Sequence, residues 1–322
     1  MICYPVIIPT LNRYEHFRRC IESLSRCTHA EKTEVVVGLD YPPSEKYVEG
    51  YDKIKNYLPE ISGFSNVKVL HSEINLGPNQ NLKRLRDYVE NEGYDAYIAT
   101  EDDNEFSPCF LDYMNKALSR YRNDENVIYI CGYSSINNMS NYSNNIYFAR
   151  HHSGWGAGSW FSKRKRVVPF LNIDSLKKVL SSWKLSMKLF SMRPNSLSAM
   201  ITQVNNNMLY GDSCFTSYCL LNNVYCLFPS KSLVRNWGND GTGVNCKIDN
   251  GYYIGQEIDD RLLFELDKVE VAETKETRRL LKKGYTKHWY GNIAMFIRYI
   301  VWRLLKKDFF VVLKKMGLVY DK

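Results

Sequence analysis

Short apolar runs alternate with amphipathic stretches over the first 131 residues of the chain. Stripes of apolar residues at i, i+3, i+4 and i+7, such as Phe17, Cys20, Ile21 and Leu24, predict helices. Runs of five or six mostly apolar residues between them predict buried strands. The expected strands are Pro5–Pro9, Glu34–Leu39, Val67–His71, Ala96–Thr100 and Val127–Cys131. Strands and helices in this alternation predict an α/β fold with a mostly parallel central sheet flanked by helices.

The sequence pattern changes from about Asn137, and we expect three segments: 1–133, 134–275 and 276–322. The polar run Asn137–Asn145 and the glycine-rich run Asn236–Asn245 predict loops. Residues 176–189 and 212–222 have helical patterns, Asn205–Asn207 interrupts the pattern between them, and the chain beyond Thr274 is basic and helical. Segment 276–322 is therefore expected to form a basic helical tail.

Composition narrows the class of protein. Hydrophobic residues make up 44% and charged residues 24% of the chain, which excludes general disorder. No uncharged apolar run of 18 residues is present, and the N-terminus begins directly in a strand-like run without a signal-peptide pattern. The nine cysteines are odd in number and form no CxxC pair, so we expect reduced thiols in a cytoplasmic protein.

The charge is concentrated at one end. Of the net charge of +8, residues 278–322 carry +10, and the rest of the chain is close to neutral at −2. This distribution argues against nucleic-acid binding by the body and favours a tail that meets an anionic surface. Within Ile293–Leu318, basic residues interrupt the apolar ones, which forbids spanning but suits the headgroup region. The expected location is the inner face of the cytoplasmic membrane; the alternative is a helix packed on the body.

The strongest candidate for chemistry is the acidic run Glu101-Asp102-Asp103, directly after a predicted strand. Ligands in parallel α/β sheets bind beyond the carboxyl ends of the strands. Three adjacent carboxylates there repel one another unless a cation neutralises them, and Mg²⁺ or Mn²⁺ prefers such oxygen ligands. The alternative is an acidic turn favoured by the dipole of the following helix, expected over Ser107–Arg122.

Four segments, in order, carry a family resemblance. They are PVIIPTLNR (Pro5–Arg13), VVVGLD (Val35–Asp40), NLGPNQNLKR (Asn75–Arg84) and EDDNEFSPCFLDYMNKAL (Glu101–Leu118). Together they resemble GT-A-fold (Rossmann-like) nucleotide-sugar glycosyltransferases of the family 2 type. The EDD run followed by S-P-x-F-x-x-Y resembles the N-acetylglucosaminyltransferase I group and bacterial surface-polysaccharide glycosyltransferases. Later matches extend the resemblance over roughly residues 4–246: GWGAGSW (Gly154–Trp160), Gly211-Asp212 and PSKSLVRNWGNDGTG (Pro229–Gly243).

The resemblance implies roles for individual residues. Asp103 would bind Mn²⁺ or Mg²⁺ directly, Asp102 would lie near the ribose and the water shell of the metal, and Asp212 would be the general base. Residues 1–133 would bind the nucleotide sugar, and residues 134–275 would bind the acceptor and carry the base. The implied donor-binding residues are Pro9, Thr10, Arg13, Asp40, Asn81, Glu101, Asp102, Trp155, Asp240, Thr242 and Gly243. Among them, Arg13, Asp40 and Asn81 would hold the uridine, and Asp240–Gly243 would cover the diphosphate.

Each of these roles competes with an ordinary structural one. Asp212 precedes a predicted helix and could be its N-cap, and Asp240 lies in an Asp-Gly turn signal. Asp40 could be a polar strand end. Trp155 could stack on a sugar or pack in the core. The pair His151-His152 suggests a metal site, but adjacent histidines usually point in different directions, and the resemblance provides no matching ligand.

The predicted function is metal-dependent transfer of a sugar, with inversion, from a UDP-linked donor to a glycan or lipid-linked glycan in bacterial surface-polysaccharide synthesis. One metal-binding carboxylate and one distant basic carboxylate are the minimum that such a displacement needs. Arg193, Asn195 and Gln203 are candidates for acceptor contacts. A sugar nucleotidyltransferase is the alternative enzyme, although Thr10–Arg13 lacks the glycine-rich loop it needs. A non-catalytic glycan-binding protein that kept the fold is the second alternative.

Overall fold

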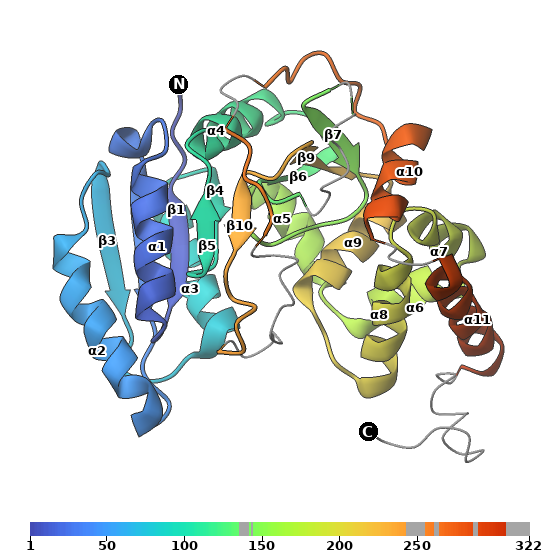
Figure 1. The fold of residues 1–322 in the computed structure, drawn as a ribbon, viewed down its shortest axis with the longest axis horizontal. Helices are drawn as coiled ribbons and strands as arrows, with labels where there is room; N and C mark the ends of the chain where they lie inside the picture. Colours follow the sequence, from blue (N-terminus) through green and yellow to red (C-terminus); the bar gives the residue numbers. More distant parts are fainter. Residues whose placement is uncertain (135–141, 143, 243–254, 261–263, 286–288, 307–322) are drawn as a thin grey trace.

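The computed structural model describes residues 1–134, 142, 144–242, 255–260, 264–285 and 289–306, and helices cover both faces of its central sheet (Figure 1). Among these residues, eight strands form the sheet in the order β3-β2-β1-β4-β8-β6-β9-β7. The strands are β1 (Val6–Thr10), β2 (Glu34–Leu39), β3 (Asn66–His71), β4 (Ala96–Ala99), β6 (Val127–Cys131), β7 (Ile146–Ala149), β8 (Ala157–Trp160) and β9 (Tyr225–Pro229). Only β7 and β8 run antiparallel to the others in this described sheet. The expected α/β fold with a mostly parallel sheet is confirmed.

The inner parallel strands are buried on both faces, which explains their mostly apolar sequences, whereas the edge strand β3 is partly exposed. On β1, Val6 and Ile8 belong to one core with residues of three helices, whereas Ile7 belongs to a second core on the opposite face. The first face is covered by α1 (Tyr14–Ser25), α2 (Val48–Tyr57) and α4 (Phe110–Arg120), and the second by α3 (Gly77–Asn91) and α5 (Phe161–Val167). All five strands expected from the sequence are present.

Strand β8 lies in the middle of the sheet, where the sequence predicted no strand. Its glycine-rich sequence AGSW lacks the β-branched residues that usually mark a strand. A Cβ at Gly158 would lie 3.0 Å from the Met114 side chain and 3.1 Å from the Tyr97 carbonyl oxygen. The glycine therefore lets α4 approach the sheet closely, and packing overrides the weak strand propensity.

The second half adds four helices beside the sheet: α6 (Ile173–Ser181), α7 (Trp183–Phe190), α8 (Pro194–Asn206) and α9 (Gly211–Asn222). The single helix expected over 176–189 is wrong, because Ser182 adopts an extended conformation and divides it. The Ser182 side chain accepts a hydrogen bond from the Leu185 amide at 3.4 Å, so it caps α7. The expected interruption at 205–207 is confirmed: Asn207 ends α8 with φ of +52°.

The C-terminal segment forms α10 (Lys275–Gly284) and α11 (Trp289–Leu305) within the described residues. Helix α11 packs on the body, since Tyr299 and Trp302 are buried and Arg298 donates hydrogen bonds to Ser198 and Thr202 on α8. None of the described helices is long and apolar enough to cross a membrane. Residues 307–322, the C-terminal part of the expected tail, lie outside the described residues, as do residues 137–141 and 143 of the expected loop Asn137–Asn145.

The carboxyl ends of β1, β2, β4 and β6 lie at one edge of the sheet, because these strands are parallel. The antiparallel β8 begins at the same edge, where the Gly132 amide donates to the Gly156 carbonyl at 2.7 Å. A separate two-stranded ribbon also reaches this edge: β5 (Asn104–Phe106) pairs antiparallel with β10 (Val234–Asn236). Segments distant in sequence therefore meet where the acidic run lies.

Candidate active site

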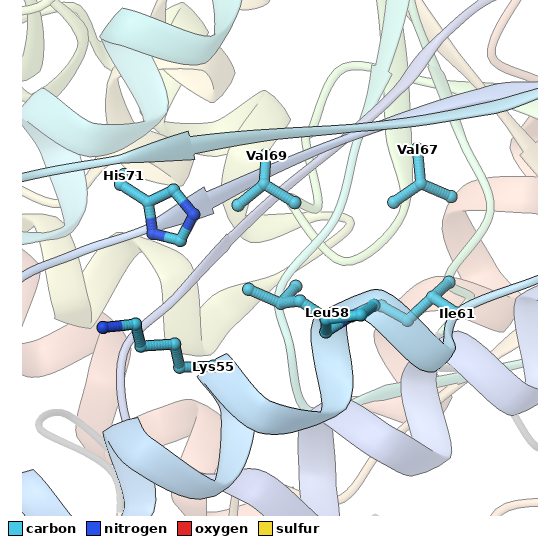
Figure 2. Close-up of a pocket in the computed structure, with 7 residues that line it drawn as sticks. Lys55, Leu58, Ile61, Val67, Val69 and His71 are labelled. Carbon is cyan, nitrogen blue, oxygen red and sulfur yellow. The ribbon is translucent and has the colours of Figure 1, made fainter.

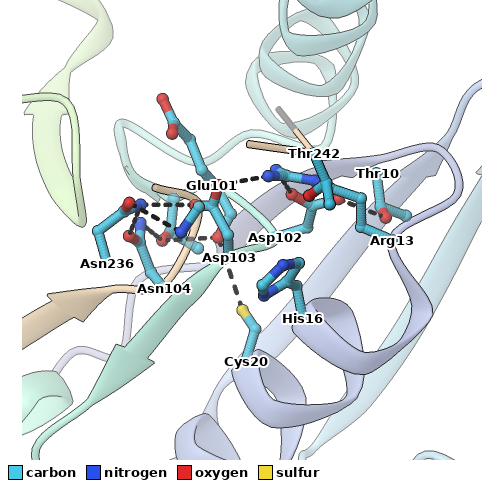
Figure 3. Close-up of polar contacts among 12 residues, drawn as sticks. Thr10, Arg13, His16, Cys20, Glu101, Asp102, Asp103, Asn104, Asn236 and Thr242 are labelled. Atoms are coloured by element: carbon cyan, nitrogen blue, oxygen red, sulfur yellow. Dashed lines mark hydrogen bonds and ion pairs between the residues drawn. The ribbon is translucent and has the colours of Figure 1, made fainter. Parts of the chain in front are cut away.

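Two of the three acidic residues are buried and share one arginine (Figure 3). Arg13 forms ion pairs with Asp102 and, at 2.8 Å between Nη1 and Oδ2, with Asp103. Thr10 donates a hydrogen bond to Asp102 Oδ2 at 2.9 Å. Strand β5 separates the acidic run from α4, which begins at Phe110 and not at the expected Ser107. The alternative of a turn held by the dipole of this helix is therefore not supported.

The site carries more negative charge than its arginine neutralises. Desolvation opposes the charge of Arg13, but Asp102 and Asp103 outweigh it and raise the pKa of the guanidinium. Glu101 is exposed at its surface side, but the surrounding protein removes part of its hydration. This desolvation, followed in importance by the charges of Asp103 and Asp212, raises the pKa of Glu101 to about 8. Desolvation also raises the pKa of Asp102, against the opposing charge of Arg13. Two carboxylates pair with one guanidinium and a third carboxyl group lies next to them in sequence, so the chemistry of the site suits a further cation.

The donor set fits a hard divalent cation only in part. Among the described residues, no group of three His, Cys, Asp or Glu side chains is arranged to hold a metal by itself. Asp103 offers two carboxylate oxygens, each with one N–H contact: Arg13 on Oδ2 and Asn236, at 2.7 Å, on Oδ1. Each oxygen retains a second lone pair. This arrangement fits Mn²⁺ or Mg²⁺, which commonly take most ligands from water and substrate phosphates.

The ribbon of β5 and β10 holds a second segment against the acidic run. The Trp237 amide donates to the Asp103 carbonyl at 2.9 Å, and Asn236 also donates to Asn104 at 2.9 Å. The next residue, Gly238, lies so close that a Cβ there would be 2.1 Å from Asp103 Oδ2. Asn236 did not emerge from the sequence as a site residue, because only the pairing of β5 with β10 brings it to Asp103.

The loop that continues from Gly238 returns to the first helix. Asp240 Oδ2 lies 2.9 Å from His16 Nε2, and Asp240 Oδ1 accepts hydrogen bonds from the amide and hydroxyl of Thr242 at 2.9 and 2.7 Å. Desolvation opposes these bonds, but they outweigh it and lower the pKa of Asp240 to about 2. The structure therefore places Asp240 and Thr242 beside the acidic run, as a turn anchored on α1. Gly243 lies outside the described residues.

Asp212 belongs to the first turn of α9 and faces the acidic run from the second half of the chain. It is not the N-cap of this helix: the cap residue is Tyr210, without a side-chain cap bond. Its side chain is 60% exposed, and Asp212 Oδ1 lies 2.8 Å from Nδ1 of the buried His152. Desolvation lowers the pKa of His152, but the hydrogen bond and charge of Asp212 outweigh it, so the pKa is raised. Asp212 is an accessible carboxylate held by a buried imidazole.

His152 is the functional candidate that the sequence analysis set aside. The two histidines point apart, as expected: the His151 ring stacks on Phe228 at 4.3 Å between centroids, while His152 reaches Asp212. The sequence signal was the histidine pair itself, ahead of GWG, but it suggested a metal and not a carboxylate partner. A Cβ at Gly154 would lie 3.5 Å from Asp212 Oδ1, so this loop also borders the carboxylate.

Other predicted residues have partners within the protein. Asp40 is buried. At the start of α3, its Oδ1 accepts a 2.8 Å hydrogen bond from the Leu76 amide, and its Oδ2 accepts one of the same length from the Gly77 amide. Asn81 is buried and donates to the Gly38 carbonyl at 2.8 Å. Their predicted contacts with uridine stay predictions, and both side chains already serve the local fold.

The aromatic candidate Trp155 is half-buried against the core, and its ring contacts that of Tyr133 edge-on at 4.6 Å between centroids. Both of its alternatives therefore retain support, because the ring packs on one side and is partly exposed. Pro9 is half-buried near the end of β1 and precedes Thr10. The eight cysteines among the described residues are free thiols.

Two hollows differ in their relation to these residues. The larger, about 460 Å³, lies between α2 and the edge strand β3, and Leu58, Val67 and Val69 line it (Figure 2). It is remote from the carboxylates and mostly apolar. The smaller, about 220 Å³, lies between α8 and α9 and is lined by Asp212 and Arg193, among others. The chemistry therefore points to the smaller hollow.

Comparison with known proteins gives the family. The sequence model for glycosyl transferase family 2 matches residues 6–174, just over half of the chain. The chain belongs to glycosyl transferase family 2. This family-2 chain is therefore a glycosyltransferase with a GT-A-type α/β fold. The match includes the acidic run but ends before Asp212. The resemblance to the N-acetylglucosaminyltransferase I group is not confirmed and stays a prediction.

Solved structures match only parts of the chain. TarS from S. aureus has 16% sequence identity, covering 40% of this chain and 21% of the TarS chain, with a TM-score of 0.29. A structure of TarS residues 1–349 has 17% identity, covering 40% of this chain and 34% of that chain, with a TM-score of 0.30. A Pyrobaculum calidifontis mannosyltransferase, solved with GDP-Man and Mn²⁺, has 13% identity over 51% of this chain and 46% of its own, with 0.35. The chain spans less than half the length of each. No curated protein matches this chain.

Proposed function

We propose that this glycosyltransferase moves a sugar from a UDP-linked donor to a hydroxyl of a glycan or lipid-linked glycan, with inversion and with Mn²⁺ or Mg²⁺. One observation carries the proposal. The acidic run and Asp212 come from the two halves of the chain, yet they lie close enough for the charge of Asp212 to help raise the pKa of Glu101. A displacement needs a charge-stabilising group and a base on opposite sides of the reacting carbon.

On the donor side, Asp103 is the proposed metal ligand, and Asp102 with Arg13 fixes its surroundings. When bound, the cation would stabilise negative charge on the departing nucleoside diphosphate. Arg13 orients both carboxylates, because it pairs with each of them. The turn at Asp240 and Thr242 stands beside this site and is proposed to cover the diphosphate, together with Gly243.

On the acceptor side, Asp212 is the proposed general base. It is exposed enough to reach an acceptor hydroxyl, and it borders the 220 Å³ cavity in the second half of the chain. His152 orients the carboxylate through the 2.8 Å contact and leaves Asp212 Oδ2 available for the proton. The proposal requires no covalent enzyme intermediate, so a single displacement would invert the anomeric centre.

The test is calorimetric titration of UDP and GDP, with and without Mn²⁺, followed by transfer assays. We expect UDP binding that requires both Mn²⁺ and Asp103, and loss of at least about 100-fold in transfer for Asp103→Asn and Asp212→Asn. UDP should still bind to Asp212→Asn, because the base does not hold the donor. Asp174→Asn, an exposed residue paired with Lys177, is the matched control and should behave as wild type. Full turnover by both site variants would refute the assignment.

We also propose attachment to the inner face of the cytoplasmic membrane, which suits bacterial surface-polysaccharide synthesis. Support comes from α11, whose outer face exposes Tyr290, Ile293, Ile297 and Leu304 at helical spacing while its inner face packs on α8. Such a face, with the exposed Lys306 at the end of the helix, suits the headgroup region. Co-sedimentation with phosphatidylglycerol vesicles should exceed that with phosphatidylcholine and should fall for Ile297→Glu; equal sedimentation with both lipids would contradict attachment.

A further inference from the structure

The cavity beside Asp212 contains a cation that the proposed mechanism does not use. This cavity of about 220 Å³ is lined by Arg193 and Asn195 at the start of α8, by Gln203 further along it, and by Tyr210 and Asp212 at the start of α9. All three residues expected from the sequence to face the acceptor are in this set. Gln203 is engaged within the protein, because it donates to Ser213 at 2.7 Å and accepts from the Tyr210 amide at 3.0 Å.

Arg193 is half-buried, and its guanidinium has no polar partner among the described residues. Its Nε is buried without a hydrogen-bond partner there. The guanidinium lies over the Tyr285 ring at 4.1 Å. By contrast, Arg13 pairs with two aspartates and Arg150 pairs with Glu273 at 3.0 Å. A guanidinium presents five N–H donors and is always charged. A guanidinium without acceptor groups around it can therefore bind a ligand that supplies them.

The surroundings of Arg193 favour an anion. Asp212, the acid in the same cavity, is held by His152 and forms no ion pair with Arg193 among the described contacts. Arg193 stands at the N-terminus of the 13-residue helix α8, where the helix dipole adds positive potential. The neighbouring His151 is buried, and its Nδ1 also has no hydrogen-bond partner in the described part of the chain. No described carboxylate neutralises this end of the cavity.

We propose that Arg193 binds a negatively charged group of the acceptor, a carboxylate or a phosphate, while Asp212 receives the proton of the acceptor hydroxyl. This inference rests on the proposed function and names the acceptor class: an anionic glycan. Planar guanidinium groups bind both carboxylates and phosphates through paired hydrogen bonds. Because the cavity joins Arg193 to Asp212, the anion would lie on the acceptor close to the attacking hydroxyl.

The test uses three defined probes: methyl β-D-glucuronide for the carboxylate, glucose 6-phosphate for the phosphate and methyl β-D-glucoside as the neutral sugar. Binding is measured by ligand-observed NMR titration. We expect at least one anionic probe to bind about 10-fold more tightly than the glucoside, the gain typical of a charged hydrogen bond. Arg193→Gln should remove this preference, and Arg193→Lys should keep part of it. Arg122→Gln, which removes the same charge from an exposed pair with Asp95, is the matched control.

Equal binding of all three probes by the wild type, including no binding of any, would overturn the inference. So would an anion preference that survives in a folded Arg193→Gln variant. UDP titration with Mn²⁺ separates this inference from the proposed function: Arg193→Gln should bind UDP normally, and a parallel loss of UDP binding would assign Arg193 to the donor. Anion binding through Arg193 in a wild type that binds neither UDP nor GDP would refute the donor proposal alone.

Discussion

Gly238 is the position where one added methyl group should damage the site most selectively. An alanine Cβ there would lie 2.1 Å from Asp103 Oδ2, 2.8 Å from Asp103 Cγ and 3.2 Å from Arg13 Nη1. The first two distances are far inside van der Waals contact. The loop cannot simply retreat, because the Gly238 amide is bonded to Asn236 Oδ1 at 3.0 Å and Asn236 is bonded to Asp103. The Asp103 carboxylate must therefore turn away.

The magnitude follows from the contacts that Asp103 would lose. It would give up the 2.7 Å hydrogen bond from Asn236 and the 2.8 Å ion pair with Arg13. Hydrogen bonds to charged groups contribute about 1.5–3 kcal/mol each, and overpacking typically costs about 1–3 kcal/mol. Because water recovers part of the loss, we expect Gly238→Ala to lower the free energy of unfolding by about 3 kcal/mol. At about 2 °C per kcal/mol, Tm would fall by about 6 °C.

A double-mutant cycle is the decisive assay, with Tm and urea denaturation as readouts. Asp103→Ala removes both atoms that the new methyl group would hit, so Gly238→Ala should cost less than about 1 kcal/mol in that background, a coupling of about 2 kcal/mol or more. Gly291→Ala, a helical glycine with open space around it, is the control and should be neutral or slightly stabilising. An equal cost of Gly238→Ala with and without the Asp103 carboxylate would refute the reasoning.

Two other positions give independent predictions. Lys163 is buried and donates hydrogen bonds of 2.7 to 2.8 Å to three backbone carbonyls after α4. Lys163→Met should therefore lower the free energy of unfolding by about 3 kcal/mol, whereas Lys165→Met, at an exposed neighbouring position, should lower it by less than about 1 kcal/mol. Chemical denaturation measures both values, and equal small effects would contradict the structural role of Lys163. Because Asp212 raises the pKa of His152 in the folded state, the stabilisation from this pair should be fully present below about pH 6.5 and be lost as the pH rises through the raised value. The stability gap between wild type and His152→Gln should therefore narrow on alkalinisation, and a gap that widens would disprove the assigned sign.

The sequence predicted the first half of the fold well because its signals are local. Short apolar runs rich in β-branched residues, such as Glu34–Leu39, are typical of buried strands, and this strand lies where expected. The second half depends on long-range contacts that leave no such periodicity. Strand β8 is a glycine-rich run made into a strand by its neighbours, and Ser182 divides a pattern that would otherwise continue as one helix. Packing and a single cap decide these cases.

The contacts of the candidate site also fall into those that the sequence predicts and those that depend on long-range packing. The strand-end position of the acidic run and its nearness to Arg13 follow from parallel topology, which the sequence reveals. Arg193 was a candidate for acceptor contacts, but its clustering with Asp212 depends on α8, a helix that the sequence analysis did not predict. The contact of Asn236 with Asp103 was not predictable either, since 132 residues separate the two strands of the ribbon at this point. No local pattern encodes such a pairing.

The interleaved strand order bears on how the chain can be divided. Strand β6 precedes residue 133, yet its parallel neighbour β9 begins at Tyr225, and β5 finds its partner β10 only at Val234. A fragment ending at residue 174, where the family match stops, would expose the β6 edge and leave Asp103 without its loop. During synthesis, the acidic site can therefore close only after about the first 240 residues have left the ribosome. The part of the chain that completes the acidic site is therefore larger than the region that matches the family.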